Sequence, residues 1–82
     1  MPQAPTPATK DLSALGAAIR RLRAMKAMSQ EQLSLEAGLH RNYVGRVERQ
    51  ELSPTFEPLV SIARALQVSP DELMRLYLLE LG

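Results

Sequence analysis

Two short helical segments, joined by only a few residues, limit the possible folds of this chain most strongly. The stretch SQEQ at 29–32 is a capping box, in which the serine hydroxyl accepts from the amide of the second glutamine. Gly38 can end this first segment in a left-handed conformation. A second segment follows from about Arg41 to Arg49, with Val44 and Val47 facing the core. Helices joined this tightly cross steeply, and the small Ser34 lets them approach closely.

Three further segments complete an all-α prediction of five helices and no strand. Apolar residues at 12, 15, 19 and 22 predict a helix over about 12–26. Thr55 can cap a fourth helix, whose apolar stripe is 59, 62, 63 and 66. The stretch SPDE at 69–72 opens the fifth with a cap serine, a proline and a glutamate in favoured positions. Residues 1–10, with three prolines, are predicted as a disordered lead-in, and 11–82 as one domain.

The composition excludes several classes of function. Without cysteine there is no disulfide or thiolate site, which fits a reducing cytoplasm, and one histidine cannot build a histidine-rich metal site. The first ten residues lack the layout of a signal peptide, and no apolar run approaches the roughly 18 residues of a membrane span. There is no glycine-rich phosphate loop, so we expect neither an enzyme nor a cofactor.

Charge is distributed unevenly along the chain, although the net charge is only +1. Residues 20–49 carry seven basic and three acidic groups, a balance of +4, whereas residues 51–82 carry two basic and five acidic groups, a balance of −3. The asymmetry indicates a basic pole that meets an anion and an opposite pole with another role.

The outer face of the third helix carries the side chains that suit base recognition. With both valines inward, positions 41, 42, 45, 46 and 49 fall outside. Arginine pairs with guanine and asparagine with adenine in the major groove, and Gly45 would let the backbone approach a base. A solvated basic face explains the same residues equally well.

The chain from Leu15 to Met74 resembles the lambda-repressor-like (XRE) helix-turn-helix family. The shared motifs are SQEQL, the AGL turn, Y-V-x-x-V-E-R, and S-P-T followed by L-x-x-I-A-x-A-L-x-V-S, all in register. Within the family, small restriction–modification controller proteins and phage repressors are the most similar in size. The resemblance implies a five-helix DNA-binding domain with the helix-turn-helix at helices two and three.

The resemblance also implies roles for individual residues. The base-reading residues would be Arg41, Asn42, Gly45 and Arg46. The DNA backbone contacts would be Gln30, Tyr43, Arg49, Ser53, Thr55 and His40, and Tyr43 could instead pack partly in the core. Arg23 and Glu48 would form a structural ion pair.

Three positions depart from the family pattern. His40 stands where a serine, threonine or aspartate usually caps the third helix; a neutral imidazole can accept one amide hydrogen, and a protonated one would favour phosphate. Gln50 and Glu51 replace the usual glycine and basic residue, which removes positive charge from the loop. Leu35 is apolar where an exposed residue is expected, as a partner contact or a stray leucine.

The last helix is apolar nearly all round. Residues 73–81, LMRLYLLEL, have seven apolar positions of nine, more than one protomer's core can bury. We expect a homodimer interface here, formed by Met74, Tyr77, Leu78, Leu79 and Leu81. A frayed C-terminus or a site for a different protein would also explain the pattern.

These observations together predict a sequence-specific transcriptional regulator. A homodimer would bind double-stranded DNA at an inverted-repeat operator, with its recognition helices one turn apart. RNA polymerase is a further candidate partner through Glu51 and Glu57, although solvated surface charge also accounts for both. The alternatives are an antitoxin whose last helix packs on a toxin, and a small helical adaptor that does not bind DNA.

Overall fold

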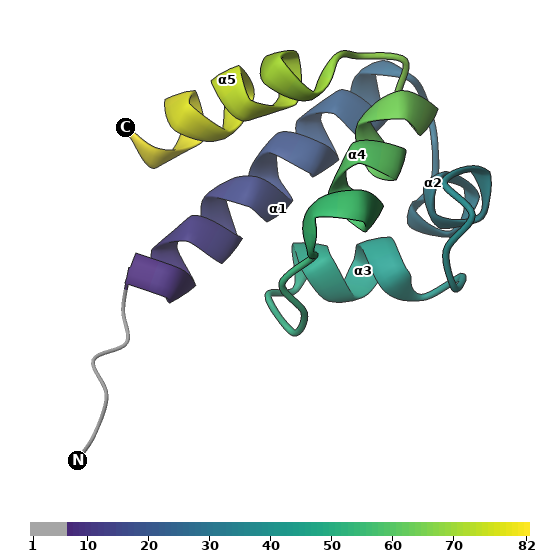
Figure 1. The fold of residues 1–82 in the computed structure, drawn as a ribbon, viewed down its shortest axis with the longest axis horizontal. Helices are drawn as coiled ribbons and strands as arrows, with labels where there is room; N and C mark the ends of the chain where they lie inside the picture. Colours follow the sequence, from purple (N-terminus) through teal and green to yellow (C-terminus); the bar gives the residue numbers. More distant parts are fainter. Residues whose placement is uncertain (1–6) are drawn as a thin grey trace.

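The computed structural model describes residues 7–82, with side chains from Lys10 onward. It contains five helices, α1 (Pro7–Met25), α2 (Gln30–Glu36), α3 (Tyr43–Glu48), α4 (Phe56–Ala65) and α5 (Pro70–Leu81), and no strand within the described range (Figure 1). The prediction of an all-α, five-helix fold is confirmed.

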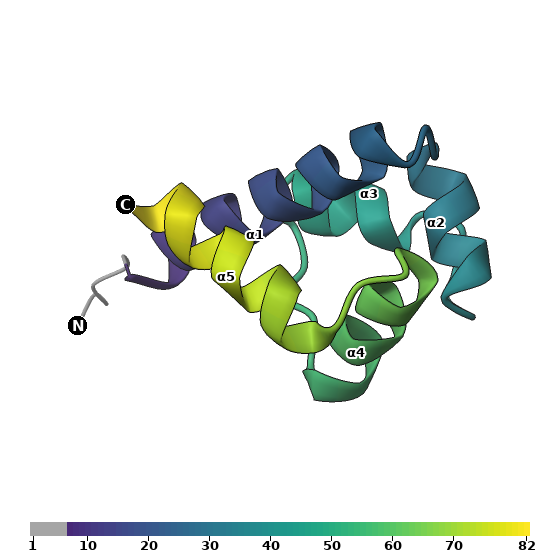
Figure 2. The same ribbon diagram turned by 90° about the horizontal axis from the view of Figure 1, so that it is seen from above.

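The helices are arranged so that α3 and α5 lie on different sides of the molecule. The long helix α1 has α5 antiparallel beside it in both views (Figures 1 and 2). Helix α3 packs against α1 and α2, whereas α4 packs against α2 and α5. Helix α3 and the apolar C-terminal helix are therefore separated in space (Figure 1), whereas the first part of the basic segment, on α1, meets α5, where Arg21 Nη2 lies 2.9 Å from Glu80 Oε2.

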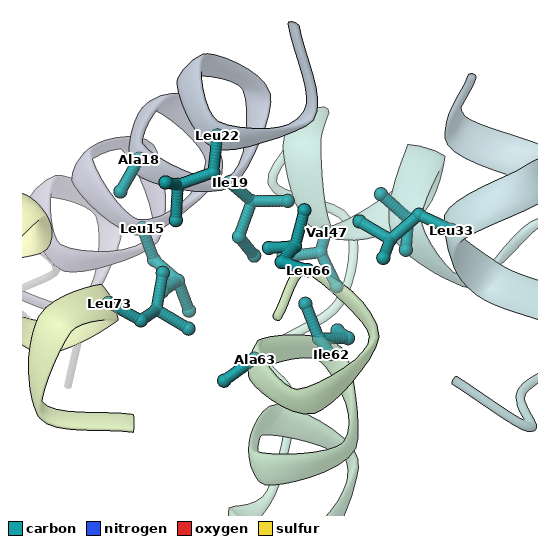
Figure 3. Close-up of a cluster of buried hydrophobic side chains, with 11 residues drawn as sticks. Leu15, Ala18, Ile19, Leu22, Leu33, Val47, Ile62, Ala63, Leu66 and Leu73 are labelled. Carbon is teal, nitrogen blue, oxygen red and sulfur yellow. The ribbon is translucent and has the colours of Figure 1, made fainter. Parts of the chain in front are cut away.

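A single apolar core receives side chains from all five helices (Figure 3). The helical spacing places these residues on the inner face of each helix, where burial of apolar area stabilises the fold. The cluster consists of Leu15, Ala18, Ile19, Leu22, Leu33, Val44, Val47, Ile62, Ala63, Leu66 and Leu73. Both valines of the third predicted helix are fully buried, as their spacing predicts.

Two of the three predicted helix caps form as expected. The Ser29 hydroxyl accepts from the Gln32 amide at 3.0 Å, and the Ser69 hydroxyl accepts from the Glu72 amide at 3.3 Å. Thr55 occupies the N-cap position of α4, but its side chain makes no capping hydrogen bond, so this part of the prediction is wrong.

Four helices end in the same type of left-handed turn. After α2, Gly38 has φ 76° and the Leu39 amide donates to the Ser34 carbonyl at 2.9 Å. The other three turns place a non-glycine residue at positive φ: Ala27 at 56°, Gln50 at 64° and Gln67 at 63°. A left-handed conformation costs an L-residue about 1–2 kcal/mol, so these three turns carry local strain.

Two helix boundaries differ from the sequence prediction. Helix α1 begins at Pro7, so residues 7–10 are helical and not a disordered lead-in, while residues 1–6 lie outside the described range. Proline suits a first helical turn, and packing on α5 supports this end: the Tyr77 hydroxyl donates to Asp11 Oδ1 at 2.6 Å. Helix α3 is shorter than predicted, because residues 41 and 42 form a turn before it.

Candidate nucleic-acid interface

A buried serine fixes how α3 is set against α2. The Ser34 hydroxyl accepts from the backbone amide of Val44 at 3.0 Å and donates to the Gln30 carbonyl at 2.9 Å. The Val44 amide belongs to the first turn of α3, where no partner within the helix exists. Ser34 therefore caps α3 from the neighbouring helix, a role that sequence reasoning missed when it used only the small size of this residue.

Arg23 and Glu48 form the ion pair that the family resemblance implies. Two nearly parallel hydrogen bonds join them, from Arg23 Nε to Glu48 Oε2 at 2.9 Å and from Arg23 Nη2 to Glu48 Oε1 at 3.0 Å. The remaining guanidinium nitrogen, Nη1, donates to the Met28 carbonyl at 2.9 Å. One side chain of α1 thus ties the end of α3 to the turn before α2.

Glu48 is almost fully buried, with 2% of its surface exposed. Burial alone would raise its pKa, but hydrogen bonds from Arg23 and Gln30, together with the charges of Arg23 and Arg20, bring the pKa below its ordinary value. Gln30 Nε2 donates to Glu48 Oε1 at 2.8 Å, and Arg20 Nε lies 3.5 Å from the same oxygen. A charged carboxylate at this position therefore connects α1, α2 and α3.

Gly16 allows α1 and α3 to approach closely. A Cβ atom at Gly16 would lie 3.0 Å from Glu48 Cα and 3.2 Å from the Glu48 carbonyl oxygen. Because these are backbone atoms held by the ion pair, α3 would have to shift to accept a larger residue. Sequence reasoning missed this contact; its only signal was a glycine within the apolar stretch of α1.

Three of the four predicted base-reading residues are exposed together on the free side of α3. Arg41 and Asn42 lie in the turn before the helix, and Arg46 lies within it. A shallow depression of about 150 Å³ adjoins them, lined by Gln30, Glu31, Arg41, Asn42, Gly45 and Arg49. This surface offers arginine and asparagine donors beside a hollow of polar character.

Gly45 lies on this face and lines the depression, but it is buried there, so its role in base recognition stays a prediction. The cause of the burial is the covering of α3 by two long side chains: Gln30 Oε1 lies 2.9 Å and Arg49 Nη1 3.0 Å from the place of a Cβ at Gly45. A base could approach this part of the backbone only after these side chains move.

Some of the residues predicted to contact the DNA backbone already form hydrogen bonds within the protein, and others are exposed. Gln30 is half-buried and its amide donates to Glu48, while Tyr43 is half-buried against the core and burial raises the pKa of its hydroxyl. Ser53 and Thr55 are exposed in and after the loop that follows α3. His40 is exposed, and its Nδ1 accepts from the Asn42 amide at 3.1 Å, which requires an unprotonated nitrogen.

Arg46 and Arg49 share one acidic neighbour. Glu51 Oε2 accepts from Arg49 Nε at 3.0 Å, and Glu51 Oε1 lies 3.9 Å from Arg46 Nε. The hydrogen bond from Arg49 and the charges of both arginines hold the pKa of Glu51 below its ordinary value. All three side chains are about half exposed, so the cluster is open to solvent.

The apolar C-terminal helix divides into two kinds of residue. Met74, Leu78 and Leu79 are exposed at 37%, 61% and 70%. Tyr77 and Leu81 are half-buried, and the Asp11 hydrogen bond that anchors Tyr77 to α1 raises the pKa of this phenol. Tyr77 therefore packs within its own protomer, and its part in a dimer interface stays a prediction.

A second apolar feature lies between α4 and α5. An apolar groove of about 210 Å³ is lined by Phe56, Leu59, Val60, Pro70, Leu73 and Met74. Phe56, the only phenylalanine of the chain, is 79% exposed at the start of α4. Sequence reasoning did not assign Phe56 a role, and its signal was a large aromatic residue directly after a helix cap.

Two other types of site are absent from the described part of the chain. Residues 7–82 contain no group of three or more histidine or acidic side chains arranged to hold a metal ion. None of the helices α1 to α5 combines the length and apolar character needed to cross a bilayer.

Comparison with known proteins identifies the family. A helix-turn-helix family model matches residues 19–73. The control protein C.SmaI of Serratia marcescens is 43% identical over 56 residues, which cover 68% of this chain and 67% of that protein. The crystal structure of the restriction–modification controller protein C.AhdI from Aeromonas hydrophila has 41% identity and a TM-score of 0.74, covering 77% of this chain and 96% of that one.

A second controller structure agrees over more of the chain. Wild-type C.Esp1396I has 30% identity and a TM-score of 0.79, covering 85% of this chain and 90% of that one. The family is one of DNA-binding regulators and not of enzymes. With its five helices and its α2–α3 pair, this chain belongs to the lambda-repressor-like (XRE) helix-turn-helix family.

Proposed function

We propose that this protein is a sequence-specific transcriptional regulator of the controller type, binding a palindromic DNA operator as a homodimer. The observation that carries the proposal is the exposed surface of Arg41, Asn42 and Arg46, which lie in the turn before α3 and in α3 itself, a helix whose position is held at both ends. Ser34 holds its first turn and Glu48 its last. The relative C.Esp1396I, whose structure covers 87% of this chain at 30% identity, has been solved as a nucleoprotein complex.

In the proposed complex, α3 enters the major groove. Arg41, Asn42 and Arg46 contact base edges there, because their donors match guanine and adenine. The phosphate contacts come from residues around this helix: Gln30, His40, Tyr43, Arg49, Ser53 and Thr55. These contacts set the register of the protein on DNA, while the three base-reading residues determine sequence preference.

The homodimer is proposed to form through the apolar surface of α4 and α5. Met74, Leu78 and Leu81 lie within about 60° of one another around α5, whereas Leu79 lies about 100° further round. The surface therefore continues from Met74 into the apolar groove beside Phe56, and Leu79 falls outside it. A two-fold axis here would pair identical surfaces and set the two α3 helices one DNA turn apart, about 34 Å.

The proposal also includes a contact with RNA polymerase through an exposed glutamate. Glu51 is engaged by Arg49, so exposed Glu57 in the first turn of α4 becomes the better candidate of the two. In a transcription assay, Glu57→Lys would then lower activation at equal operator occupancy. A regulator of this kind would act in the cytoplasm, beside the DNA it controls.

The direct test is selection of bound sequences from a random duplex library at about 150 mM salt, with the mass of the protein in solution measured in parallel. We expect an inverted repeat with half-site centres about ten base pairs apart, bound by a dimer. A helical adaptor would instead enrich no sequence, with weak binding that disappears as salt rises. An antitoxin would bring a second polypeptide with it during purification.

A further inference from the structure

One acidic side chain restrains the basic groups at the end of the recognition helix. Glu51 stands where the family usually has a basic residue, and it contacts two arginines of the proposed DNA surface. Its two bonds to Arg49, at 3.0 Å from Nε and 3.4 Å from Nη2, engage one edge of the guanidinium. The loop therefore removes positive charge where phosphates are expected and also fixes the direction of a side chain.

The backbone turn after α3 places this carboxylate. Gln50 adopts φ 64°, its amide donates to the Val47 carbonyl at 3.0 Å, and the Glu51 amide donates to the Arg46 carbonyl at 2.8 Å. This left-handed turn reverses the chain, so the Glu51 side chain returns alongside the helix it follows. Gln50 at positive φ carries local strain, and the turn that it forms places the Glu51 carboxylate beside both arginines.

The restraint reaches the middle of the proposed DNA surface. With its Nε edge held by Glu51, Arg49 extends back over α3, so that Nη1 lies 3.0 Å from the place of a Cβ at Gly45. Arg49 there lines the same depression as Arg41 and Asn42. Release of Arg49 would remove one of the two side chains that cover Gly45 and would free a cation for a phosphate.

We propose, on the basis of the DNA-binding function above, that Glu51 is a specificity-determining residue that acts by restraining Arg46 and Arg49. On non-target DNA the arginines stay paired with Glu51, so their contribution to phosphate binding is reduced. At the operator, the base contacts made by neighbouring residues hold the protein long enough, and in the correct register, for both arginines to exchange Glu51 for DNA. Because the ion pairs are broken only at the operator, Glu51 lowers affinity for the operator more than affinity for non-target DNA.

The test compares Glu51→Gln with the charge-matched Glu72→Gln, an exposed glutamate in the first turn of α5, in the full chain, on operator and scrambled duplexes. Because exposed ion pairs are weak, we expect Glu51→Gln to bind the operator about two- to five-fold more tightly and scrambled DNA more tightly by a smaller factor. For this variant on scrambled DNA, the slope of log Kd against the logarithm of the salt concentration should steepen by about 0.9, which corresponds to one added phosphate contact. Glu72→Gln should leave both the affinity ratio and the slope near wild type.

Three outcomes separate the possible explanations. An unchanged ratio of operator to scrambled affinity in Glu51→Gln overturns the role of Glu51, while the DNA-binding function stands. Equal changes in both variants mean that only net charge acts, which also overturns it. If the wild-type protein itself does not distinguish operator from scrambled DNA, the proposed function fails and this inference fails with it.

Discussion

Replacing Ser34 with alanine should weaken the protein through one buried backbone amide. The substitution removes the hydroxyl that accepts from the Val44 amide, and because Val44 and Ser34 are both fully buried, water cannot replace it. An unsatisfied buried donor costs about 1–3 kcal/mol. Alanine recovers about 0.5 kcal/mol of helix propensity, which leaves a net loss of about 1–2.5 kcal/mol in the free energy of unfolding.

For a domain of this size, each kcal/mol shifts Tm by about 4–8 °C, so Ser34→Ala should lower Tm by several degrees or more in a thermal melt. Hydrogen exchange adds a local measurement, because the Val44 amide should lose protection before the other amides of the core. Ser29→Ala is the matched control: it removes an exposed cap of α2, and Val44 should stay protected. A stability change below about 0.5 kcal/mol, with normal protection of Val44, would refute the capping of α3 by Ser34.

Four other changes test separate features of the structure. Gln67→Gly should raise the free energy of unfolding by about 0.5–1 kcal/mol in denaturant titration, because relief of the left-handed strain exceeds the extra entropy of glycine in the unfolded chain; a less stable variant would contradict the strain. Glu48 has a lowered pKa in the folded protein, so its contribution is present above its ordinary pKa and is lost as the pH falls through the folded pKa. The stability difference between wild type and Glu48→Gln should therefore shrink from pH 7 to acid, and a constant difference would rule out a charged native Glu48. Arg41→Ala should lose about 1–3 kcal/mol of operator binding and relax the selected sequence at one base, with an unchanged Tm; uniform weakening on all sequences would make it a phosphate contact. Phe56→Glu should yield a folded monomer in sedimentation, since the side chain is 79% exposed in the protomer; an intact dimer would move the interface elsewhere.

Local signals in the sequence predicted much of the fold. The serine caps at 29 and 69 and the left-handed Gly38 form as expected, because each depends on residues within a few positions of one another. Val44 and Val47 are buried because helical periodicity places them on one side. These are short-range effects, and a single sequence carries them in full.

The candidate site was predictable only in part. The exposure of Arg41, Asn42 and Arg46 follows from the inward direction of the valines. The burial of Gly45 does not, since it results from side chains that arrive from α2 and from the far end of α3. The same holds for Tyr77, whose hydroxyl finds its acceptor on a residue 66 positions away.

By itself, therefore, the sequence determined the number and type of helices, their inner faces, most of their caps and the basic character of α3. The family motifs added the Arg23–Glu48 pair, which spacing alone does not specify. Only the tertiary structure decided that Ser34 caps α3, that Gly16 leaves room for the α3 backbone at Glu48, and that Glu51 pairs with two arginines. The physical reason is range: helix periodicity and capping act between neighbours in the chain, whereas backbone contacts between helices and the final direction of long side chains depend on how all five helices pack.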